Sequence, residues 1–320
     1  MKIGVFDPVF GEMELEPMLD RVVELGLDAV EIGAGNYPGD RRCKPAELLR
    51  DPDAIDRFGT AVSSRGLQIS ALSCHGNPIH PNAERAAHDD AVFRDTVRLA
   101  EKLDVTVVNL FSGCPGDGPD AKQPNWVTCA WPPEFGELLA WQWESVVIPY
   151  WREAGAFATA HGVRLGFEMH PGFVVYNPRT LLRLRAEVGE VIGANLDPSH
   201  LFWQGIDPIR AVRELGPAIF HVHAKDTAID AYNTALNGVL DIEDYRNVGG
   251  RSWAFRSVGD GHDLLFWKQF ASALRLAGYD GVLSIEHEDS LASVDEGLAR
   301  AIGTLRGAVL GEAPAQMWWA

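Results

Sequence analysis

The sequence predicts an α/β protein whose single domain, residues 1–320, folds as a (β/α)8 TIM barrel. Short apolar runs of strand length occur eight times along the 320-residue chain, and turn residues follow them. The runs are apolar throughout, which is typical of parallel strands buried on both faces of a sheet. Segments with helical periodicity lie between them, and eight such units in a chain of this length favour a closed barrel.

The predicted strands are, in chain order, KIGVF (2–6), DAVEIG (28–33), QISALSC (68–74), TVVNLF (106–111), VRLGFEM (163–169), VIGANLD (191–197), AIFHVHA (218–224) and GVLSIE (281–286). Helical periodicity is present in LEPMLDRVVELG, AVFRDTVRLAEKL, NPRTLLRLRAEVG, DPIRAVRELG, WKQFASALRLAG and VDEGLARAIGTLRG. Pro178 and Pro208 fit the first turn of their helices, with Asn177 and Asp207 as N-caps. A doubly wound sheet is the competing fold, but no GxGxxG motif follows the first strand.

Two connections are unusually long: residues 112–144 after the fourth strand and 225–262 after the seventh. Long connections in a compact domain are usually lids or subunit contacts. The first is rich in aromatic residues, namely Trp126, Trp131, Phe135, Trp141 and Trp143. These side chains would suit a sugar or an aryl group at the barrel mouth, but packing within the loop or at a dimer contact is an equal alternative.

The composition excludes several classes of function. A formal net charge of -17 opposes binding to nucleic acid or to an anionic membrane. The cysteines lack CxxC spacing and are expected to be reduced, buried thiols: Cys43, Cys74, Cys114 and Cys129. The chain has no apolar run of membrane-spanning length and starts directly with a strand, so we expect a cytoplasmic protein.

Four residues near the ends of the last four strands predict a metal site: Glu168, Asp197, His223 and Glu286. The carboxyl ends of barrel strands meet at one rim, so these side chains are expected to converge. Three carboxylates and one imidazole suit one divalent ion, with Mn²⁺ the first expectation and Mg²⁺ or Co²⁺ the alternatives. His221 competes with His223; because side chains two apart share a strand face, it would then lie one layer deeper.

Such a site indicates a metal-dependent enzyme acting on a small polar substrate, and a keto-sugar could chelate the ion through its carbonyl and a neighbouring hydroxyl. The metal ion would polarise a carbonyl and stabilise an enediolate after the α-proton leaves, with Glu168 and Glu286 as the acid–base pair. The first hypothesis is therefore a metal-dependent isomerase or epimerase of a keto-sugar or related polyol. If a leaving group lies β to the carbonyl, the same enediolate would expel it, so a lyase is the alternative. No glycine-rich phosphate cradle follows the seventh or eighth strand, which argues against a phosphorylated substrate.

Further polar residues near the predicted rim are candidates for substrate binding or for orienting the ligands. His170 is a candidate base, and the candidates for substrate contact are His75, Asn77, His200, Lys225, Arg256 and His262. For each, a structural role is the alternative: hydrogen bonding to a ligand, capping a loop or, for Lys225, pairing with Asp226. Glu31, which ends the second strand, is expected either to reach the mouth or to act as a buried acceptor.

The motifs EMHPG, NLDPSH, HVHAKD and SIEHED, in this order, resemble the xylose isomerase-like TIM-barrel superfamily, and within it the proteins labelled sugar phosphate isomerase/epimerase. Resemblance to its ketose 3-epimerases implies metal ligation by Glu168, Asp197, His223 and Glu286, with His200 contacting substrate. Resemblance to its keto-glycoside lyases and C-glycoside deglycosidase catalytic subunits implies His170 as the base and, for the lyase alternative, release of the aglycone from a 3-keto-glycoside by β-elimination. The superfamily also contains endonuclease IV, but here the fourth strand ends in Asn109, Leu110 and Phe111 in place of a histidine ligand.

The expected partners are a small-molecule sugar or keto-glycoside substrate and further copies of the chain in a homo-oligomer. The resemblance to deglycosidases adds a small β-rich partner subunit as an alternative. Neither nucleic acid nor a membrane is expected to bind.

Overall fold

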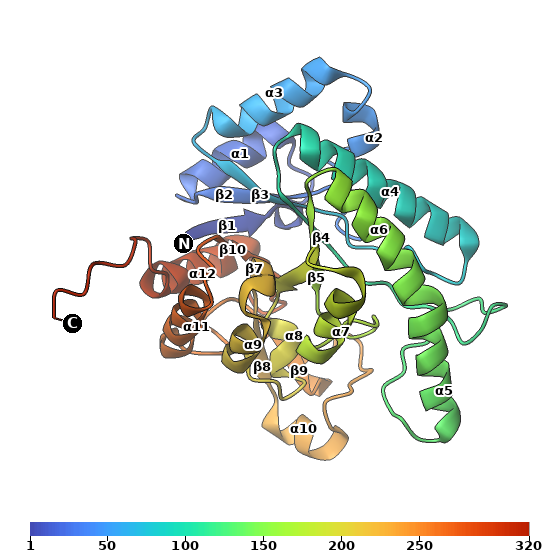
Figure 1. Cartoon of the computed structure of the whole chain (residues 1–320). Helices are drawn as coiled ribbons and strands as arrows, with labels where there is room; N and C mark the ends of the chain where they lie inside the picture. The colour runs from blue at the N-terminus through green and yellow to red at the C-terminus, as the bar shows by residue number, and fades with distance from the viewer. Residues whose placement is uncertain (320) are drawn as a thin grey trace.

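The computed structural model describes residues 1–319 and contains a closed barrel of eight parallel strands (Figure 1). Around the barrel the order is β1, β10, β7, β6, β5, β4, β3 and β2, so strands adjacent in the chain are neighbours and β10 closes the barrel onto β1. Their bounds are β1 Lys2–Phe6, β2 Ala29–Gly33, β3 Gln68–Ser73, β4 Val107–Leu110, β5 Arg164–Glu168, β6 Ile192–Leu196, β7 Ile219–Ala224 and β10 Val282–Ile285. The predicted fold and all eight predicted strands are confirmed. At the majority of strand ends, the observed boundary differs from the predicted one by a single residue.

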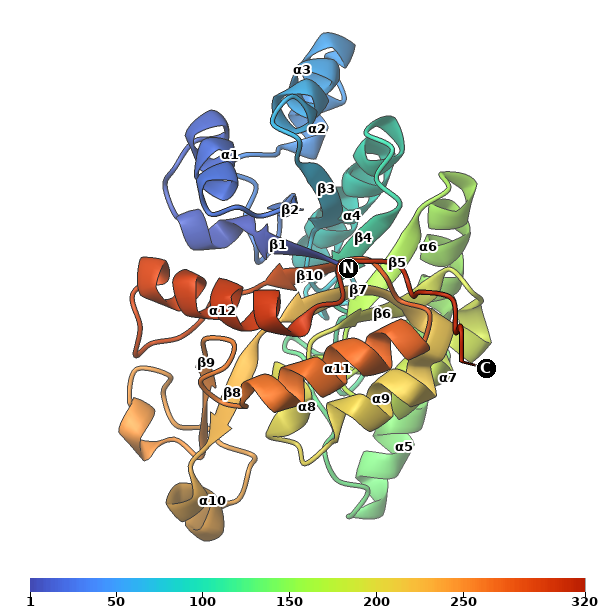
Figure 2. The ribbon, with the colours of Figure 1, turned by 90° about the vertical axis from the view of Figure 1, so that its left-hand side faces the viewer.

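Helices cover the outside of the barrel (Figure 2). Their bounds are α1 Leu15–Glu24, α2 Pro45–Leu48, α3 Pro52–Ser63, α4 Ala83–Lys102, α5 Pro133–Trp141, α6 Ile148–Ala160, α7 Pro178–Val188, α8 Ser199–Phe202, α9 Pro208–Leu215, α10 Ala231–Asn237, α11 Leu264–Leu276 and α12 Val294–Ala308. Single 3-10 turns lie at Asp7–Phe10, Gly216–Ala218 and Val248–Gly250. The predicted N-caps are confirmed: the Asn177 side chain accepts from Thr180 N at 3.0 Å, and that of Asp207 from Ile209 N at 2.9 Å.

The connection after β4 becomes one long helical rod, formed by α5, a π-helical segment Gln142–Val147 and α6. The π-helical segment lies just before Pro149, which has no backbone N–H to complete an α-helical ladder. Trp143 is buried in the core, whereas Trp131 in the preceding loop is 72% exposed. The aromatic residues of this connection therefore pack along the rod or face solvent.

The connection after β7 forms a small separate sheet in which β8 (Asp226–Ile229) pairs antiparallel with β9 (Trp253–Arg256). Trp253 stacks on Trp203 with ring centroids 4.7 Å apart, which holds this sheet against the chain after β6. The Asp226 carboxylate accepts backbone N–H groups from Gly259 at 3.0 Å, Gly261 at 3.1 Å and His262 at 2.9 Å. The Asp226 carboxylate thus joins the first residues of this connection to its last residues, 259–262.

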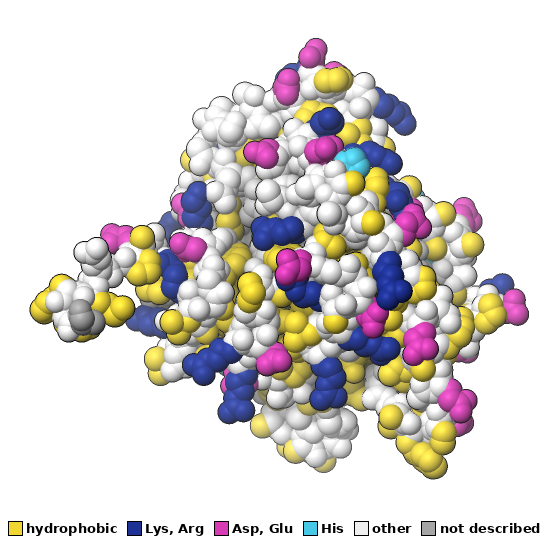
Figure 3. All heavy atoms as spheres, viewed as in Figure 1, with side chains coloured by type: hydrophobic (Ala, Val, Ile, Leu, Met, Phe, Trp, Pro, Cys, Tyr) yellow, Lys and Arg dark blue, Asp and Glu magenta, His cyan; other side chains and the backbone are white. Residues whose placement is uncertain are grey.

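Charged side chains of both signs are interspersed over the face shown in Figure 3. Within residues 1–319, no helix has both the length and the apolar composition needed to cross a membrane. Three cysteines are buried as expected, but Cys129 is exposed because its loop lies on the surface.

Candidate metal centre and active site

The four predicted metal ligands lie together at the carboxyl ends of their strands. Glu168 ends β5, Asp197 directly follows β6, His223 lies in β7 and Glu286 directly follows β10. Each contributes one ligand atom to a group whose atoms all lie within 4.8 Å of one another. His223 Nδ1 is 3.0 Å from Glu286 Oε2 and 3.3 Å from Glu168 Oε2.

The ligand atoms themselves test whether a cation fits. Asp197 Oδ2, His223 Nδ1 and Glu286 Oε2 are buried and form no hydrogen bond among the described residues; their close contacts are ion pairs within the site. Buried polar atoms without a partner are rare and indicate a missing ion or water. Two carboxylate oxygens and one imidazole nitrogen are suitable ligands for a divalent cation, so the residues fit one.

The carboxylates of the site differ in their electrostatics. Burial raises the pKa of Asp197 to about 6, although the neighbouring His200 and Lys225 oppose the rise. Burial would also raise the pKa of Glu168, but close contacts with three histidines, with His200 contributing most, hold it well below the usual range. Glu168, which stays ionised, thus lies beside Asp197, which becomes protonated near pH 6.

Two cationic side chains compensate the carboxylates in the absence of a metal ion. Burial would lower the pKa of His223, but the carboxylates of Glu31 and Glu286 raise it well above its ordinary value. Burial likewise opposes the charge on Lys225, but Glu286 and Glu288 raise its pKa well above the usual value. The site therefore concentrates negative charge that requires cations nearby.

Three further histidines surround Glu168. His75 Nε2 lies 3.0 Å from Glu168 Oε2, and His200 Nε2 lies 3.1 Å from Glu168 Oε1. The His170 ring centroid is 4.1 Å from that of His200, and its Nδ1 lies 2.6 Å from the Pro171 carbonyl oxygen. That contact assigns the proton to Nδ1 and leaves Nε2 as an acceptor. Burial lowers the pKa of His170 to about 3, so the ring is neutral at physiological pH.

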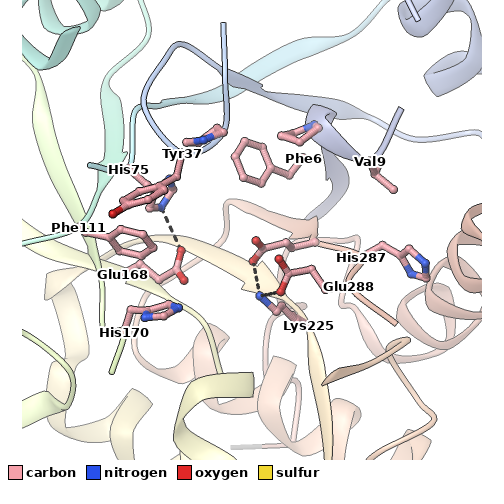
Figure 4. Close-up of a pocket in the computed structure, with 13 residues that line it drawn as sticks. Phe6, Val9, Tyr37, His75, Phe111, Glu168, His170, Lys225, His287 and Glu288 are labelled. Carbon is pink, nitrogen blue, oxygen red and sulfur yellow. Dashed lines mark ion pairs between the residues drawn. The ribbon is translucent and has the colours of Figure 1, made fainter. Parts of the chain in front are cut away.

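A cavity of about 290 Å³ opens beside these residues (Figure 4). Its polar part comprises His75, Glu168, His170, Lys225 and Glu286. The remaining wall is largely apolar and is formed by Phe6, Pro8, Val9, Tyr37, Pro38 and Phe111, with His287 and Glu288 at the edge. Its volume is close to the lower end of the usual range for small-molecule sites, roughly 300–1,000 Å³.

A second polar layer lies below the four ligands. His221 Nδ1 is 3.0 Å from Asn195 Oδ1, and its Nε2 is 3.2 Å from Ser70 Oγ. This imidazole therefore lies one layer deeper than His223, as the sequence predicted if His223 is the ligand. Glu31 is fully buried, and both of its carboxylate oxygens lie 3.0 Å from His223 Nε2. Of the two predicted locations for Glu31, the structure shows the buried acceptor.

Four of the six predicted substrate residues do not line this cavity: His200 contacts Glu168 beside it, and Asn77, Arg256 and His262 lie in the surrounding loops. Asn77 joins two loops by hydrogen bonds to the backbone of Cys114. Arg256 pairs with Asp289 at 3.1 Å, and His262 pairs with Asp226 at 2.8 Å. The polar groups of Asn77, Arg256 and His262 are engaged within the loops, so the structure does not bring these three side chains to the cavity.

Several cavity residues were missed in the sequence. Phe6 and Phe111 end or directly follow β1 and β4, so the strand-end rule that found the ligands also applies to them. Glu288 lies two residues after Glu286 in the same acidic motif. Tyr37 lies in an irregular loop after β2, where no sequence pattern indicated its direction.

Comparison with known proteins supports this architecture. The family described as xylose isomerase-like TIM barrel matches residues 19–306. YfiH of Bacillus subtilis (strain 168), described as an uncharacterized protein, is 40% identical over 309 residues, which is 96% of this chain and 98% of YfiH.

Two solved structures share the fold at lower identity. The probable 3-DHS dehydratase AsbF of Bacillus anthracis, involved in petrobactin synthesis, has a TM-score of 0.67 and 17% identity over 96% of this chain and 99% of its own. The 3-keto-D-glucoside 4-epimerase YcjR of E. coli has a TM-score of 0.64 and 14% identity over the same shares.

Proposed function

Because the chain belongs to the xylose isomerase-like TIM-barrel family, we propose that it is a divalent-metal-dependent isomerase or epimerase of a keto-sugar or related polyol. The observation that carries this proposal is the group of buried, unpartnered ligand atoms: Asp197 Oδ2, His223 Nδ1 and Glu286 Oε2. They lie beside a cavity of a size suited to a small sugar. The structural likeness to a 3-keto-D-glucoside epimerase supports the same substrate class.

A divalent cation held by Glu168, Asp197, His223 and Glu286 would supply a Lewis acid for a substrate carbonyl. Mn²⁺ is the proposed ion, with Mg²⁺ and Co²⁺ as alternatives, because oxygen ligands dominate the set.

The two glutamates supply the proton transfers. Glu168 and Glu286 come from β5 and β10, which β6 and β7 separate in the barrel, so their carboxylates approach the cavity from different directions. One carboxylate removes the α-proton and leaves an enediolate. Return of a proton to the opposite face of that carbon gives an epimer, whereas return to the neighbouring carbon gives an isomer. Neutral His170, with Nε2 as an acceptor, is a third group that can take the proton.

Histidines and a lysine prepare the site for this transfer. His75 and His200 contact opposite oxygens of Glu168 and so fix the plane of its carboxylate. Lys225 Nζ lies 3.3 Å from Glu286 Oε2. Burial would raise the pKa of Glu286, but the charges of Lys225 and His223 lower it to about 2, so this carboxylate stays ionised. Both contacts favour the basic form of the group that must accept a proton.

Proton exchange with solvent tests the proposal. The Mn²⁺-loaded protein is incubated in D₂O with a panel of ketoses and 3-keto-glucosides, and the products are analysed by NMR. We expect deuterium at one carbon, and a decrease of about 100-fold or more for Glu286→Gln. The control is Glu296→Gln, which alters an exposed glutamate of α12 paired with Arg300 and is expected to exchange at the wild-type rate. Absence of exchange with every sugar in the presence of metal would refute the proposal.

The apolar cavity wall favours a second candidate, a lyase acting on 3-keto-glycosides. Phe6, Val9, Tyr37 and Phe111 form a surface that could hold an aryl aglycone beside Glu168. The same enediolate would then expel a leaving group at the β-carbon. Release of a phenol from an aryl 3-keto-glucoside, abolished by a chelator, would establish this reaction in place of the first.

A further inference from the structure

A fully buried acidic side chain, Glu31, lies directly behind His223, one of the candidate metal ligands. Both of its oxygens lie 3.0 Å from His223 Nε2. The opposite nitrogen of the same ring, Nδ1, faces Glu168 and Glu286. The imidazole of His223 is thus held between a buried carboxylate on one side and the ligand group on the other.

The surroundings of Glu31 consist of hydrogen-bond donors. Ser73 Oγ donates to Glu31 Oε1 at 2.5 Å, and Asn109 Nδ2 donates to the same oxygen at 2.9 Å. His221 Nε2 is 3.8 Å away, and among the described residues no lysine or arginine pairs with this carboxylate. A group that only accepts, such as a carboxylate, therefore matches these neighbours, whereas an amide would place an N–H against another donor.

The environment of His223 Nε2 leads to the same assignment. Asn195 Nδ2 also lies 3.1 Å from this nitrogen and would donate only to an unprotonated Nε2. Glu31 is the stronger partner, because both of its oxygens lie at 3.0 Å and a hydrogen bond to an ionised acceptor is about twice as strong as a neutral one. A proton on Nε2 therefore points to Glu31, and the lone pair of Nδ1 is then directed at the site. Metal-binding histidines commonly donate their second N–H to a carboxylate, which fixes both tautomer and ring orientation.

We propose that Glu31 is a positioning residue that holds His223 with Nε2–H donated to its carboxylate and Nδ1 presented to the divalent cation. This inference rests on the metal dependence in the proposed function, but it concerns cation binding and needs no substrate. Glu31 itself contacts neither cation nor substrate; it acts through the imidazole. The competing explanation is that Glu31 only ties Ser73 and Asn109 together inside the barrel.

The first experiment identifies the nitrogen that binds the cation. ¹⁵N-histidine-labelled protein is loaded with Zn²⁺ or Cd²⁺, which are diamagnetic, and two-bond ¹H–¹⁵N correlation spectra are recorded. The His223 signals are assigned by their loss in His223→Asn. We expect the cation on Nδ1 and the proton on Nε2 in the wild type. A cation on Nε2 would overturn the proposal without any Glu31 variant.

The second experiment measures Mn²⁺ affinity by calorimetry and competition with a chelator. Glu31→Gln is expected to weaken binding by about 10- to 100-fold, and Glu31→Asp, which keeps the charge on a shorter side chain, is expected to recover part of the loss. Ser73→Ala is the matched control, because it removes a donor from the same carboxylate without touching His223. Its Mn²⁺ affinity should stay within about twofold of the wild type.

The outcomes separate the two proposals. If Glu31→Gln folds and binds Mn²⁺ as tightly as the wild type, or if Ser73→Ala weakens binding equally, Glu31 has only a structural role. If Glu31→Gln does not fold, Glu31→Asp and the wild-type spectra decide. If the wild type binds Mn²⁺ but exchanges no sugar proton, the proposed reaction fails while the role of Glu31 stands.

Discussion

The ammonium group of Lys225 lies 2.6 Å from the carboxylate of Glu288, and both residues border the cavity. The same nitrogen is 3.3 Å from Glu286 and lies 4.2 Å from the ring centroid of Phe255. Lys225 is buried, so its charge acts on the carboxylates with little screening. This lysine therefore compensates part of the negative charge that a metal ion would otherwise neutralise.

Replacement of Lys225 tests this compensation. Lys225→Met is expected to lower the free energy of unfolding of the metal-free protein by about 3 kcal/mol, the lower end for a broken buried pair, because Glu288 is half-exposed. Added Mn²⁺ should reduce the difference from the wild type, since the cation replaces the lost charge. Urea unfolding with and without Mn²⁺ measures both effects. An equal loss in the two conditions would show that Lys225 and the cation act independently.

Asp197 is predicted to bind the cation through its charge and to support the fold through a separate oxygen. Asp197 Oδ1 accepts from Ser199 N at 2.7 Å, whereas Oδ2 has no hydrogen-bond partner. Asp197→Asn can keep the first contact, so the protein should fold and lose Mn²⁺ affinity by about 100-fold or more, as measured by calorimetry. Asp207→Asn is the control: it changes an exposed N-cap aspartate to an equally good cap and should bind Mn²⁺ normally.

Cation binding is predicted to release protons. The pKa of His223 is raised well above its ordinary value in the metal-free protein, and a cation at Nδ1 must displace the proton there. Apparent Mn²⁺ affinity should therefore rise with pH in the neutral range, and fall more steeply below about pH 6, where Asp197 also becomes protonated. Calorimetry in buffers of different ionisation enthalpy counts the protons. A pH-independent affinity between pH 5 and 7 would contradict this linkage.

The apolar wall is predicted to separate the two candidate reactions. Phe111 stacks on Phe173 at 4.3 Å and contacts the rings of His75 and His170 at 4.6 and 4.8 Å. Phe111→Ala should lower kcat/KM for an aryl 3-keto-glucoside by about tenfold, since an aromatic contact contributes about 0.5–1.5 kcal/mol beyond area burial. The exchange rate of a small ketose should change less. Equal losses on both substrates would indicate that Phe111 only orders the histidines.

The strands and the convergence of the four candidate ligands could be predicted from sequence because both follow from local rules. An apolar run gives the strand, and the residue at its carboxyl end must lie at the common rim of a parallel barrel. His262 and Arg256 could not be placed in the same way, because irregular loops bring their partners, Asp226 and Asp289, to them. Partner choice in such loops depends on tertiary packing, for which neither strand nor helix periodicity provides a signal.

Depth within the barrel was also inaccessible from the sequence. Glu31 lies near the carboxyl end of a predicted strand, as the candidate ligands do, yet it lies below them. The register between β2 and β3 shifts between Val30 and Glu31. The height of a side chain in a barrel depends on strand stagger, which no single strand encodes.

The return of residues 259–262 to Asp226 has a consequence for how this chain can change over evolutionary time. The segment between these points, which carries β8, α10 and β9, starts and ends beside Lys225. The entropy of closing a loop depends only weakly on length, about 0.6 kcal/mol for each doubling. Insertions, deletions or replacement around α10, which has no buried residue, are therefore tolerable as long as Asp226, its three backbone donors and the packing of Trp253 and Phe255 remain. New surroundings for the substrate can arise there while β7 keeps His223 in place.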